Sequence, residues 1–251
     1  MSAIPAGGRR ERVRAATVQE IKATARRLLA QEGPQAVTLR AIAREMGMTA
    51  PGLYRYFPSH EDLWEELCHD TYGAMADALE EALAGIPGDQ VELRLLTAAR
   101  RFRSWAVEHP RDFGLAFGMP LPGLSQVKDL TDPAHLSGMR FALVFTRAFG
   151  QLWSARPFPV LQEEEIAPAL AEQLRRYRDA MAAAEPGLPD LPLGVVLVFL
   201  QAWVQLYGVV TMEVFGHLGF CLTDVQDFFE AQLTSVAAAL GITRTLPGPT
   251  A

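Results

Sequence analysis

The clearest pattern of apolar and polar positions lies in residues 38–57, which read TLRAIAREMGMTAPGLYRYF. Its first apolar positions recur at the i, i+3, i+4, i+7 spacing of one helix face. These positions are Leu39, Ile42, Ala43 and Met46. Thr38 precedes them in the N-cap position, where a hydroxyl oxygen can accept a hydrogen bond from a first-turn amide. The pattern therefore predicts a short helix that begins just after Thr38.

A tight turn and a second helix follow this first helix. Gly47 stands at the predicted helix end, where glycine readily adopts the left-handed conformation of a C-terminal cap. The second helix is expected to begin at Ala50. Pro51 is tolerated there because first-turn amides have no intrahelical partner. Two helices joined this closely form a helix-turn-helix, the unit that places its second helix in the major groove of DNA.

The rest of the chain is expected to be helical, and no convincing alternation of period two interrupts it. The basic segment 1–14 is expected to be a flexible arm, followed by a first helix from about Thr17 to Gln31. The further predicted helices span residues 60–83, 90–108, 111–118, 135–155, 163–184, 193–218 and 224–240, with a proline-containing loop at 119–134. We therefore expect an all-α protein with no sheet.

Charge is distributed unevenly along the 251 residues, whose formal net charge is −6. Residues 1–60 carry ten Lys and Arg residues but four acidic ones, whereas the remainder carries 13 basic and 25 acidic residues. A basic segment that coincides with a helix-turn-helix is typical of a protein that binds DNA at one end. The alternative is a solvated basic helix face.

The chemistry of the helix-turn-helix side chains suggests different DNA contacts. Thr49, Ala50, Pro51 and Gly52 occupy the first turn of the second helix and lack the long donors that read purine edges. Ala50 and Pro51 can instead contact a thymine methyl group.

Base contacts are therefore expected from longer side chains, Arg40 and Arg55 together with the N-terminal arginines. Tyr54 and Tyr56 carry hydroxyl groups that can bind phosphates and set the register of the protein on DNA. A core role for Tyr54 is the alternative.

This region resembles the DNA-binding domain of TetR-type transcriptional regulators. The resemblance covers roughly residues 15–65 and rests on the positions Thr38, Ile42–Ala43, Gly47, Leu53–Tyr54, Tyr56–Phe57 and Leu63. It implies that Thr38 contacts a phosphate, and that His60 does so at a position commonly occupied by lysine.

A second resemblance, to the ligand-binding half of one TetR subgroup, is found in residues 102–117 and 202–210. That subgroup is marked by Trp, His and Gly in its penultimate helix. Trp203 and Gly208 match, but Tyr207 stands where the family has His. The resemblance implies an effector pocket without the contact that the histidine would make.

Aromatic residues of the body are the candidate wall of that pocket, although core packing is the alternative for each of them. The candidate ligand-binding residues are Trp105, His109, Phe113, Phe117, Phe145, Phe149, Trp153, Trp203 and Tyr207. Phe141, Phe199 and Met212 are further apolar candidates, and Gln201 and Gln205 further polar ones. We expect a flat or apolar small molecule as the effector.

Other classes of function find little support in the sequence. It contains no G-x-S-x-G elbow, Walker loop or H-E-x-x-H motif, so we expect neither an enzyme nor a bound metal or other cofactor. Cys68 and Cys221 do not form a disulfide framework, and the N-terminus lacks a signal peptide, so a cytoplasmic location is expected. Residues 191–212 carry no charge, and we interpret them as a helix buried within protein rather than a membrane span.

The sequence thus predicts an N-terminal DNA-binding domain at residues 15–62, a ligand-binding and dimerisation domain at 63–241 and a tail at 242–251. The expected partners are double-stranded operator DNA, a small-molecule effector and a second copy of the chain, which would dimerise through helices 193–218 and 224–240. A repressor is the leading interpretation. The alternatives are a small-molecule carrier or enzyme-like binding protein that retains a helix-turn-helix, and an activator or ligand-independent architectural DNA-binding protein.

Overall fold

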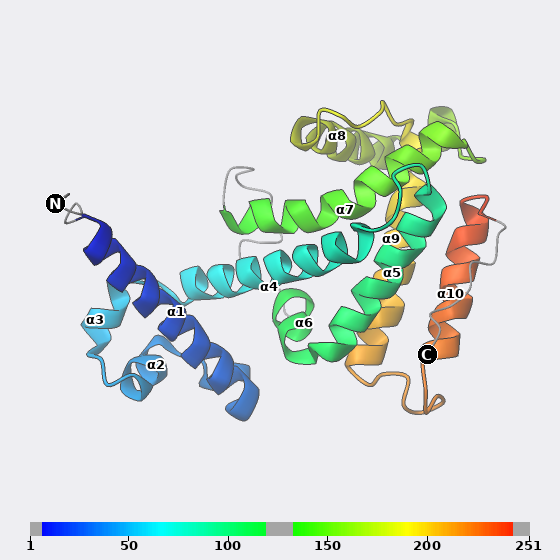
Figure 1. The fold of residues 1–251 in the computed structure, drawn as a ribbon. Helices are drawn as coiled ribbons and strands as arrows, with labels where there is room; N and C mark the ends of the chain where they lie inside the picture. Colours follow the sequence, from blue (N-terminus) through cyan, green and yellow to red (C-terminus); the bar gives the residue numbers. More distant parts are fainter. Residues whose placement is uncertain (1–6, 119–132, 243–251) are drawn as a thin grey trace. The chain divides into compact units, whose positions relative to one another are not determined.

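The computed structural model describes residues 7–118 and 133–242, and all the regular structure in these ranges is helical (Figure 1). The chain forms two compact units. The first takes in residues 1–71 and 113–135, and the second takes in residues 72–112 and 136–251, in each case as far as they are described. The boundary falls inside α4, somewhat beyond the expected domain limit at residue 62.

The first unit contains the predicted helix-turn-helix. Its elements are α1 (Gly7–Glu32), a 3-10 turn (Pro34–Ala36), α2 (Leu39–Glu45), α3 (Ala50–Tyr54), the first half of α4 (His60–Leu83) and most of α6 (Pro110–Phe117). The core of α1 to α4 is made by buried apolar side chains, chiefly Ile21, Ala25, Leu28, Ile42, Leu53, Phe57, Leu63 and Leu67. These side chains lie at helical spacing, which is why amphipathic helices of this length can share one core.

The local signals of the helix-turn-helix are confirmed. The amide N–H of Ala41 donates to Thr38 Oγ1 over 3.1 Å, so Thr38 caps α2. Gly47 has φ of 64°, in the left-handed region that a side chain disfavours, and it allows the sharp turn after α2. Thr49 then caps α3 by accepting from the amide of Gly52 over 3.3 Å.

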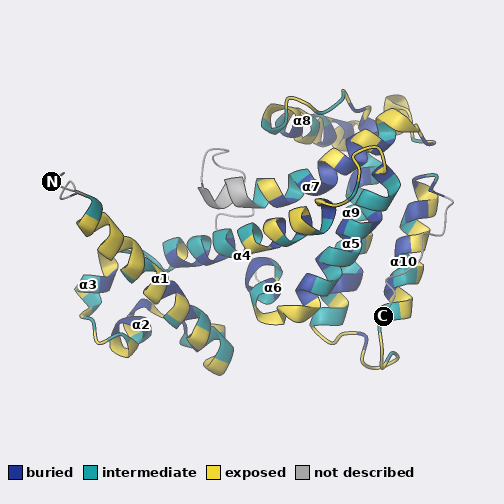
Figure 2. Cartoon of the chain, in the orientation of Figure 1, coloured by how far each residue is buried: buried dark blue, intermediate teal, exposed yellow. Residues whose placement is uncertain are grey.

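The second unit is built from the remaining helices. They are the second half of α4, α5 (Val91–Glu108), most of α7 (Pro133–Ala155), α8 (Pro168–Ala184), α9 (Leu193–Val214) and α10 (Gln226–Ala239). An aromatic cluster occupies its centre, where the ring of Trp203 lies between 5.5 and 5.9 Å from those of Phe102, Phe141 and Phe145. Figure 2 shows buried positions along α5, α7 and α9.

Three details differ from the sequence-based expectations. Helix α1 begins at Gly7, so residues 7–14 are helical rather than a flexible arm. Four of these eight residues are Arg and one is Glu, both good helix formers, which explains the earlier start. The predicted helix 163–184 is interrupted, because a 3-10 turn at Glu163–Glu165 precedes α8, which begins at Pro168.

The third difference concerns α9, which was expected to be buried on all sides. It is long and apolar enough to span a membrane, yet only a third of its most apolar stretch is buried within the protein. Val204 is 65% exposed, and Met212 lies on the surface as well. Periodicity alone could not separate a fully buried helix from one with an open apolar face.

Candidate DNA-binding surface and ligand cavity

The first turn of α3 is the part of the helix-turn-helix expected to approach base edges. Pro51 is exposed, whereas Ala50 and Gly52 are partly exposed. The hydroxyl oxygen of Thr49 accepts the capping hydrogen bond from the amide of Gly52, which leaves its O–H donor and its methyl group as the available contacts. This turn is small and mostly apolar, so it can approach a groove closely but has few donors for base edges.

Four of the predicted DNA-binding residues surround one hollow in the surface of the first unit. Thr38, Arg40, Tyr54 and His60 line it, and its volume is about 400 Å³. Tyr54 is 44% exposed, so its hydroxyl group is accessible to a phosphate. The structure therefore brings together residues from the start of α2, the end of α3 and the start of α4.

The two arginines predicted to read bases are accessible. Arg40 and Arg55 are exposed, and neither forms an ion pair within residues 7–118 and 133–242. Tyr56 is partly exposed, and the guanidinium carbon of Arg14 lies 5.5 Å from the centre of its ring. Cationic groups without an acidic partner favour binding to a phosphate backbone.

His60 is more constrained than the other predicted contacts. Its Nε2 lies 2.6 Å from the carbonyl oxygen of Val37 and 2.7 Å from Nε1 of Trp64. A single ring nitrogen donates to the carbonyl or accepts from the indole, but not both at once. Only Nδ1 of His60 is thus left for a phosphate contact, which makes His60 a weaker substitute for lysine.

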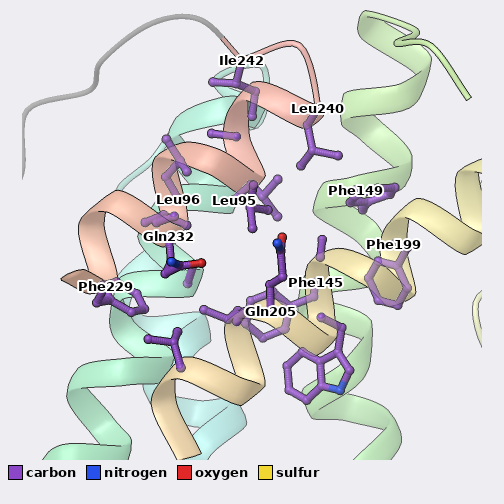
Figure 3. A pocket seen from close by; sticks show the side chains of 18 residues that line it. Leu95, Leu96, Phe145, Phe149, Phe199, Gln205, Phe229, Gln232, Leu240 and Ile242 are labelled. Carbon is purple, nitrogen blue, oxygen red and sulfur yellow. The ribbon is translucent and has the colours of Figure 1, made fainter. Parts of the chain in front are cut away.

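The second unit contains an apolar cavity between α5, α7, α9 and α10 (Figure 3). Its volume is about 50 Å³, and it is lined by Leu95, Leu96, Ala99, Phe145, Phe149, Phe199, Ala202, Trp203, Gln205, Leu206, Val209, Phe229, Gln232, Leu233, Val236, Ala237, Leu240 and Ile242. None of these 18 residues is charged. Three of the predicted ligand-binding residues, Phe145, Phe149 and Trp203, belong to this wall, as do Phe199 and Gln205.

The other predicted ligand-binding residues lie outside this cavity. Their rings instead contact aromatic neighbours: Trp105 lies 4.8 Å from His109, Phe113 lies 4.8 Å from Phe117, Trp153 lies 5.2 Å from Phe158, and Tyr207 stacks on Trp203 at 5.8 Å. Phe113 and Phe117 even belong to the first unit. These contacts agree with core packing, the alternative that the sequence left open.

Sequence reasoning missed the contribution of α10 to the cavity. Gln232 and Val236 of this helix and Leu240 at its C-terminal cap line the cavity, whereas the sequence predicts α10 only at a dimer interface. The apolar residues of α10 recur at helical spacing, but such spacing does not indicate whether a face covers a core or a cavity.

Helices α9 and α10 also form a groove on the outside of the second unit. The groove is lined by Val198, Leu200, Gln201, Ala202, Val204, Gln205, Val236, Ala239 and Leu240. Val204 in this groove is 65% exposed, and Met212 in α9 and Phe215 just after α9 are exposed as well. An apolar face of this extent on a helix pair is typical of a surface that binds protein.

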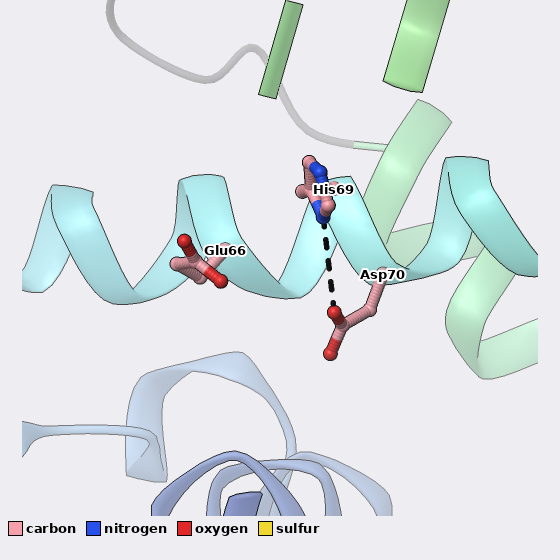
Figure 4. Close-up of side chains that lie close together, drawn as sticks. All are labelled: Glu66, His69 and Asp70. Carbon is pink, nitrogen blue, oxygen red and sulfur yellow. Dashed lines mark ion pairs between the residues drawn. The ribbon is translucent and has the colours of Figure 1, made fainter. Parts of the chain in front are cut away.

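A cluster of potential metal ligands lies on α4 of the first unit (Figure 4). The ligand atoms of Glu66, His69 and Asp70 lie within 4.8 Å of one another. The ammonium group of Lys22, however, lies 3.3 Å from Glu66 and 2.8 Å from Asp70. Because this ammonium already balances the carboxylates, the cluster is a structural ion pair rather than a cation site.

Comparisons with known proteins agree with this architecture. Residues 15–67 match the family described as bacterial regulatory proteins of the tetR family, and residues 95–236 match the family described as the tetracyclin repressor-like C-terminal domain. The HTH-type transcriptional regulator Rv1816 from Mycobacterium tuberculosis is 30% identical over 240 residues, which are 93% of this chain and 96% of that protein.

Two solved structures are similar over nearly the whole chain. The crystal structure of the regulatory protein SCO4313 has a TM-score of 0.67 at 28% identity and covers 91% of this chain and 98% of its own. RolR in complex with resorcinol has a TM-score of 0.50 at 18% identity, with coverage of 95% and 98%, and shows similarity of fold alone. The two family matches and the regulator that is 30% identical agree with the helix-turn-helix seen in the structure. The chain is therefore a member of the TetR family of transcriptional regulators, which bind DNA and respond to ligands, and is not an enzyme.

Proposed function

We propose that the protein is a repressor that binds a near-palindromic operator and is released from it by a small apolar or aromatic effector. The observation that carries this proposal is the accessible basic surface on the helix-turn-helix, where Arg40 and Arg55 lie exposed and without acidic partners among the described residues. In the other unit an apolar cavity is available for an effector. DNA binding and ligand binding thus have separate candidate sites within one chain.

In this proposal the arginines read the base sequence directly, and the remaining residues position the protein on the DNA. Arg55 and Arg40 contact base edges, where a guanidinium can bind guanine in a bidentate manner. Thr38, Tyr54, Tyr56 and His60 contact phosphates. Thr49, Ala50, Pro51 and Gly52 pack against the groove, with Ala50 and Pro51 placed for contact with a thymine methyl group.

The protein is proposed to act as a homodimer in the cytoplasm. The exposed apolar face of α9 and α10 supports this proposal, because a helix pair on each copy can form a four-helix bundle. A twofold dimer presents two recognition helices about one turn of DNA apart and reads an inverted repeat.

Release from the operator is proposed to follow a shift in population. The effector binds a conformation whose DNA-binding units do not match the spacing of the half-sites, and it thereby lowers operator affinity. This requires tighter effector binding to the free protein than to the operator complex, and equal affinities would exclude the mechanism. RolR, of similar fold, was solved with resorcinol, a small aromatic molecule.

Selection of duplexes from a random pool at physiological salt, with purified full-length protein, tests the proposal. An enriched inverted repeat is expected and would supply the operator. Weak, salt-sensitive binding without enrichment would instead favour the alternative of a small-molecule carrier that retains a helix-turn-helix. Mapping the operator against the promoter then separates a repressor, whose site overlaps the polymerase contacts, from an activator.

A further inference from the structure

We propose that the cavity between α5, α7, α9 and α10 binds an uncharged, largely apolar molecule that carries one hydrogen-bonding group, which the carboxamides of Gln205 and Gln232 hold. Such a molecule would be the effector of the regulator proposed above, so calling it an effector rests on that proposed function. Its binding can nevertheless be measured without DNA.

The composition of the wall excludes charge on the ligand. Nearly all of the lining side chains are aliphatic or aromatic, and none of them carries a charge that could balance an ion. Transfer of an unpaired charge from water into such surroundings is strongly unfavourable. An anionic or cationic ligand of the same shape would therefore bind much more weakly than its neutral analogue.

Two carboxamides interrupt this apolar wall. Gln205, an exposed residue of α9, also lines the outer groove, and Gln232, a partly exposed residue of α10, lines the cavity beside it. Figure 3 shows their amide groups next to the apolar side chains of the cavity. No hydrogen bond joins either carboxamide to another group in the described parts of the chain. Each offers a donor and an acceptor, so a hydroxyl or carbonyl group on the ligand can be held there.

The size of the cavity indicates that the ligand must displace part of its wall. Its volume of about 50 Å³ is well below that of the engineered cavity of about 150 Å³ that binds benzene. The first half of α10 is tied to α5, because Arg100 forms a bidentate ion pair with Glu230 at 2.8 to 2.9 Å. Val236 in the second half and Leu240 at the C-terminal cap hold the wall by apolar packing. We therefore place the yielding wall in the second half of α10.

This wall is shared with the outer groove. Ala202, Gln205, Val236 and Leu240 line both the cavity and the groove on the exposed face of α9 and α10. A ligand that moves these side chains changes the shape of the outer face directly. Ligand binding in the cavity would thus change the surface proposed for dimerisation, because a single layer of side chains separates the two.

Calorimetric titration of the full chain with three probes of one ring system tests this site. The probes are 2-naphthol, naphthalene and 2-naphthoate, which differ in carrying a hydroxyl group, no polar group or a negative charge. We expect saturable binding of one 2-naphthol per chain, with naphthalene weaker by about threefold to tenfold, the range of one neutral hydrogen bond. We expect 2-naphthoate to bind at least about tenfold more weakly than 2-naphthol.

Substitutions in the cavity wall test whether the probes bind in this cavity. In the double variant Gln205→Leu and Gln232→Leu, the preference for 2-naphthol over naphthalene should disappear, whereas Gln151→Leu, an exposed glutamine of α7 outside the cavity, should preserve it. Ala99→Leu adds bulk to the cavity wall and should abolish binding of both neutral probes. Because Ala99→Leu can also disturb folding, its thermal transition is compared with that of the parent, and the glutamine variant provides the test without overpacking.

Absence of saturable binding, equal affinity for 2-naphthoate, or a preference for 2-naphthol that survives loss of both glutamines would overturn the assignment. A chain that selects a specific duplex but binds no probe keeps the regulatory function and loses this site. A chain that binds 2-naphthol but selects no duplex keeps the site and loses the proposed regulation.

Discussion

The ammonium group of Lys22 in α1 lies 2.8 Å from a carboxylate oxygen of Asp70 in α4, although Lys22 is only 4% exposed. Glu66 approaches the same ammonium at 3.3 Å, and Arg26 reaches the other oxygen of Asp70 at 3.3 Å. A lysine buried to this extent is stable only when its charge is paired. This ion pair therefore fixes α1 of the DNA-binding unit to the beginning of α4.

Removal of Asp70 should leave this charge inadequately paired. We expect Asp70→Ala to lower the free energy of unfolding by as much as about 3 kcal/mol, because a buried charge that loses its partner is strongly destabilising. Lys22→Met removes the charge and keeps similar bulk, so it should cost less. Urea denaturation measures the free energy of unfolding of both variants. Glu45→Ala, in the exposed Arg27–Glu45 pair, is the control and should cost about 0–1 kcal/mol. A loss for Asp70→Ala no larger than that of the control would contradict this role.

The contacts proposed for DNA recognition can be separated by two substitutions on α3 and its C-terminal cap. Arg55→Ala should weaken operator binding and relax base preference by about 1–3 kcal/mol if the contact is bidentate. Tyr54→Phe removes only a hydroxyl group and should weaken binding to every sequence to a similar degree. Anisotropy titrations with matched and single-mismatch duplexes distinguish the two effects. Unchanged affinity in both variants would show that these residues do not contact DNA.

Two glycines of α9 should respond in opposite directions to the same substitution. A Cβ atom at Gly194 would lie 2.1 Å from the carbonyl oxygen of Leu161, whereas one at Gly208 would meet no atom within 4 Å. We expect Gly194→Ala to destabilise the fold by about 1–3 kcal/mol through overpacking. Gly208→Ala should stabilise it by up to about 1 kcal/mol through helix propensity. Similar unfolding midpoints for the two variants would argue against this close packing at the start of α9.

The two cysteines should differ in reactivity. Burial raises the pKa of the Cys68 thiol to about 12, whereas Cys221 is exposed. Because the thiolate is the reactive form, a thiol reagent at pH 8 should modify one cysteine per native chain and both after unfolding. Rapid modification of both in the native protein would be inconsistent with a buried Cys68.

The raised pKa of Cys68 also makes the free energy of unfolding depend on pH. The ordinary pKa of the thiol is 9.0, so in alkaline solution the unfolded chain loses this proton before the folded chain does. Cys68 therefore contributes stability that is fully present below about pH 9 and is lost as the pH rises toward 12. Denaturation midpoints measured from pH 8 to 10.5 should fall less steeply in Cys68→Ala than in the parent.

Much of this architecture is readable from local signals in the sequence. The N-cap at Thr38, the left-handed turn at Gly47 and the start of α4 at His60 follow from short-range chemistry, and all three are confirmed. The resemblance to TetR regulators is likewise carried by residues close together in the chain, and it is confirmed by the family matches. Such features depend on neighbours within a few residues, which a single sequence displays directly.

The ligand site was less predictable because it depends on contacts between distant helices. Phe145 and Phe113 look alike in sequence, yet one lines the cavity of the second unit and the other packs in the first unit. Nothing in the sequence around Gln232 separates it from the other glutamines of the chain. Apolar periodicity shows that a helix face is covered, but not whether a core, a ligand or a second chain covers it.

Anisotropy titration of the full chain into the selected duplex and into a scrambled duplex of equal length, at physiological salt, tests the central claim most directly. We predict that the selected duplex binds at least about 1,000-fold more tightly than the scrambled one. Equal dissociation constants for the two duplexes would contradict sequence-specific regulation by this helix-turn-helix.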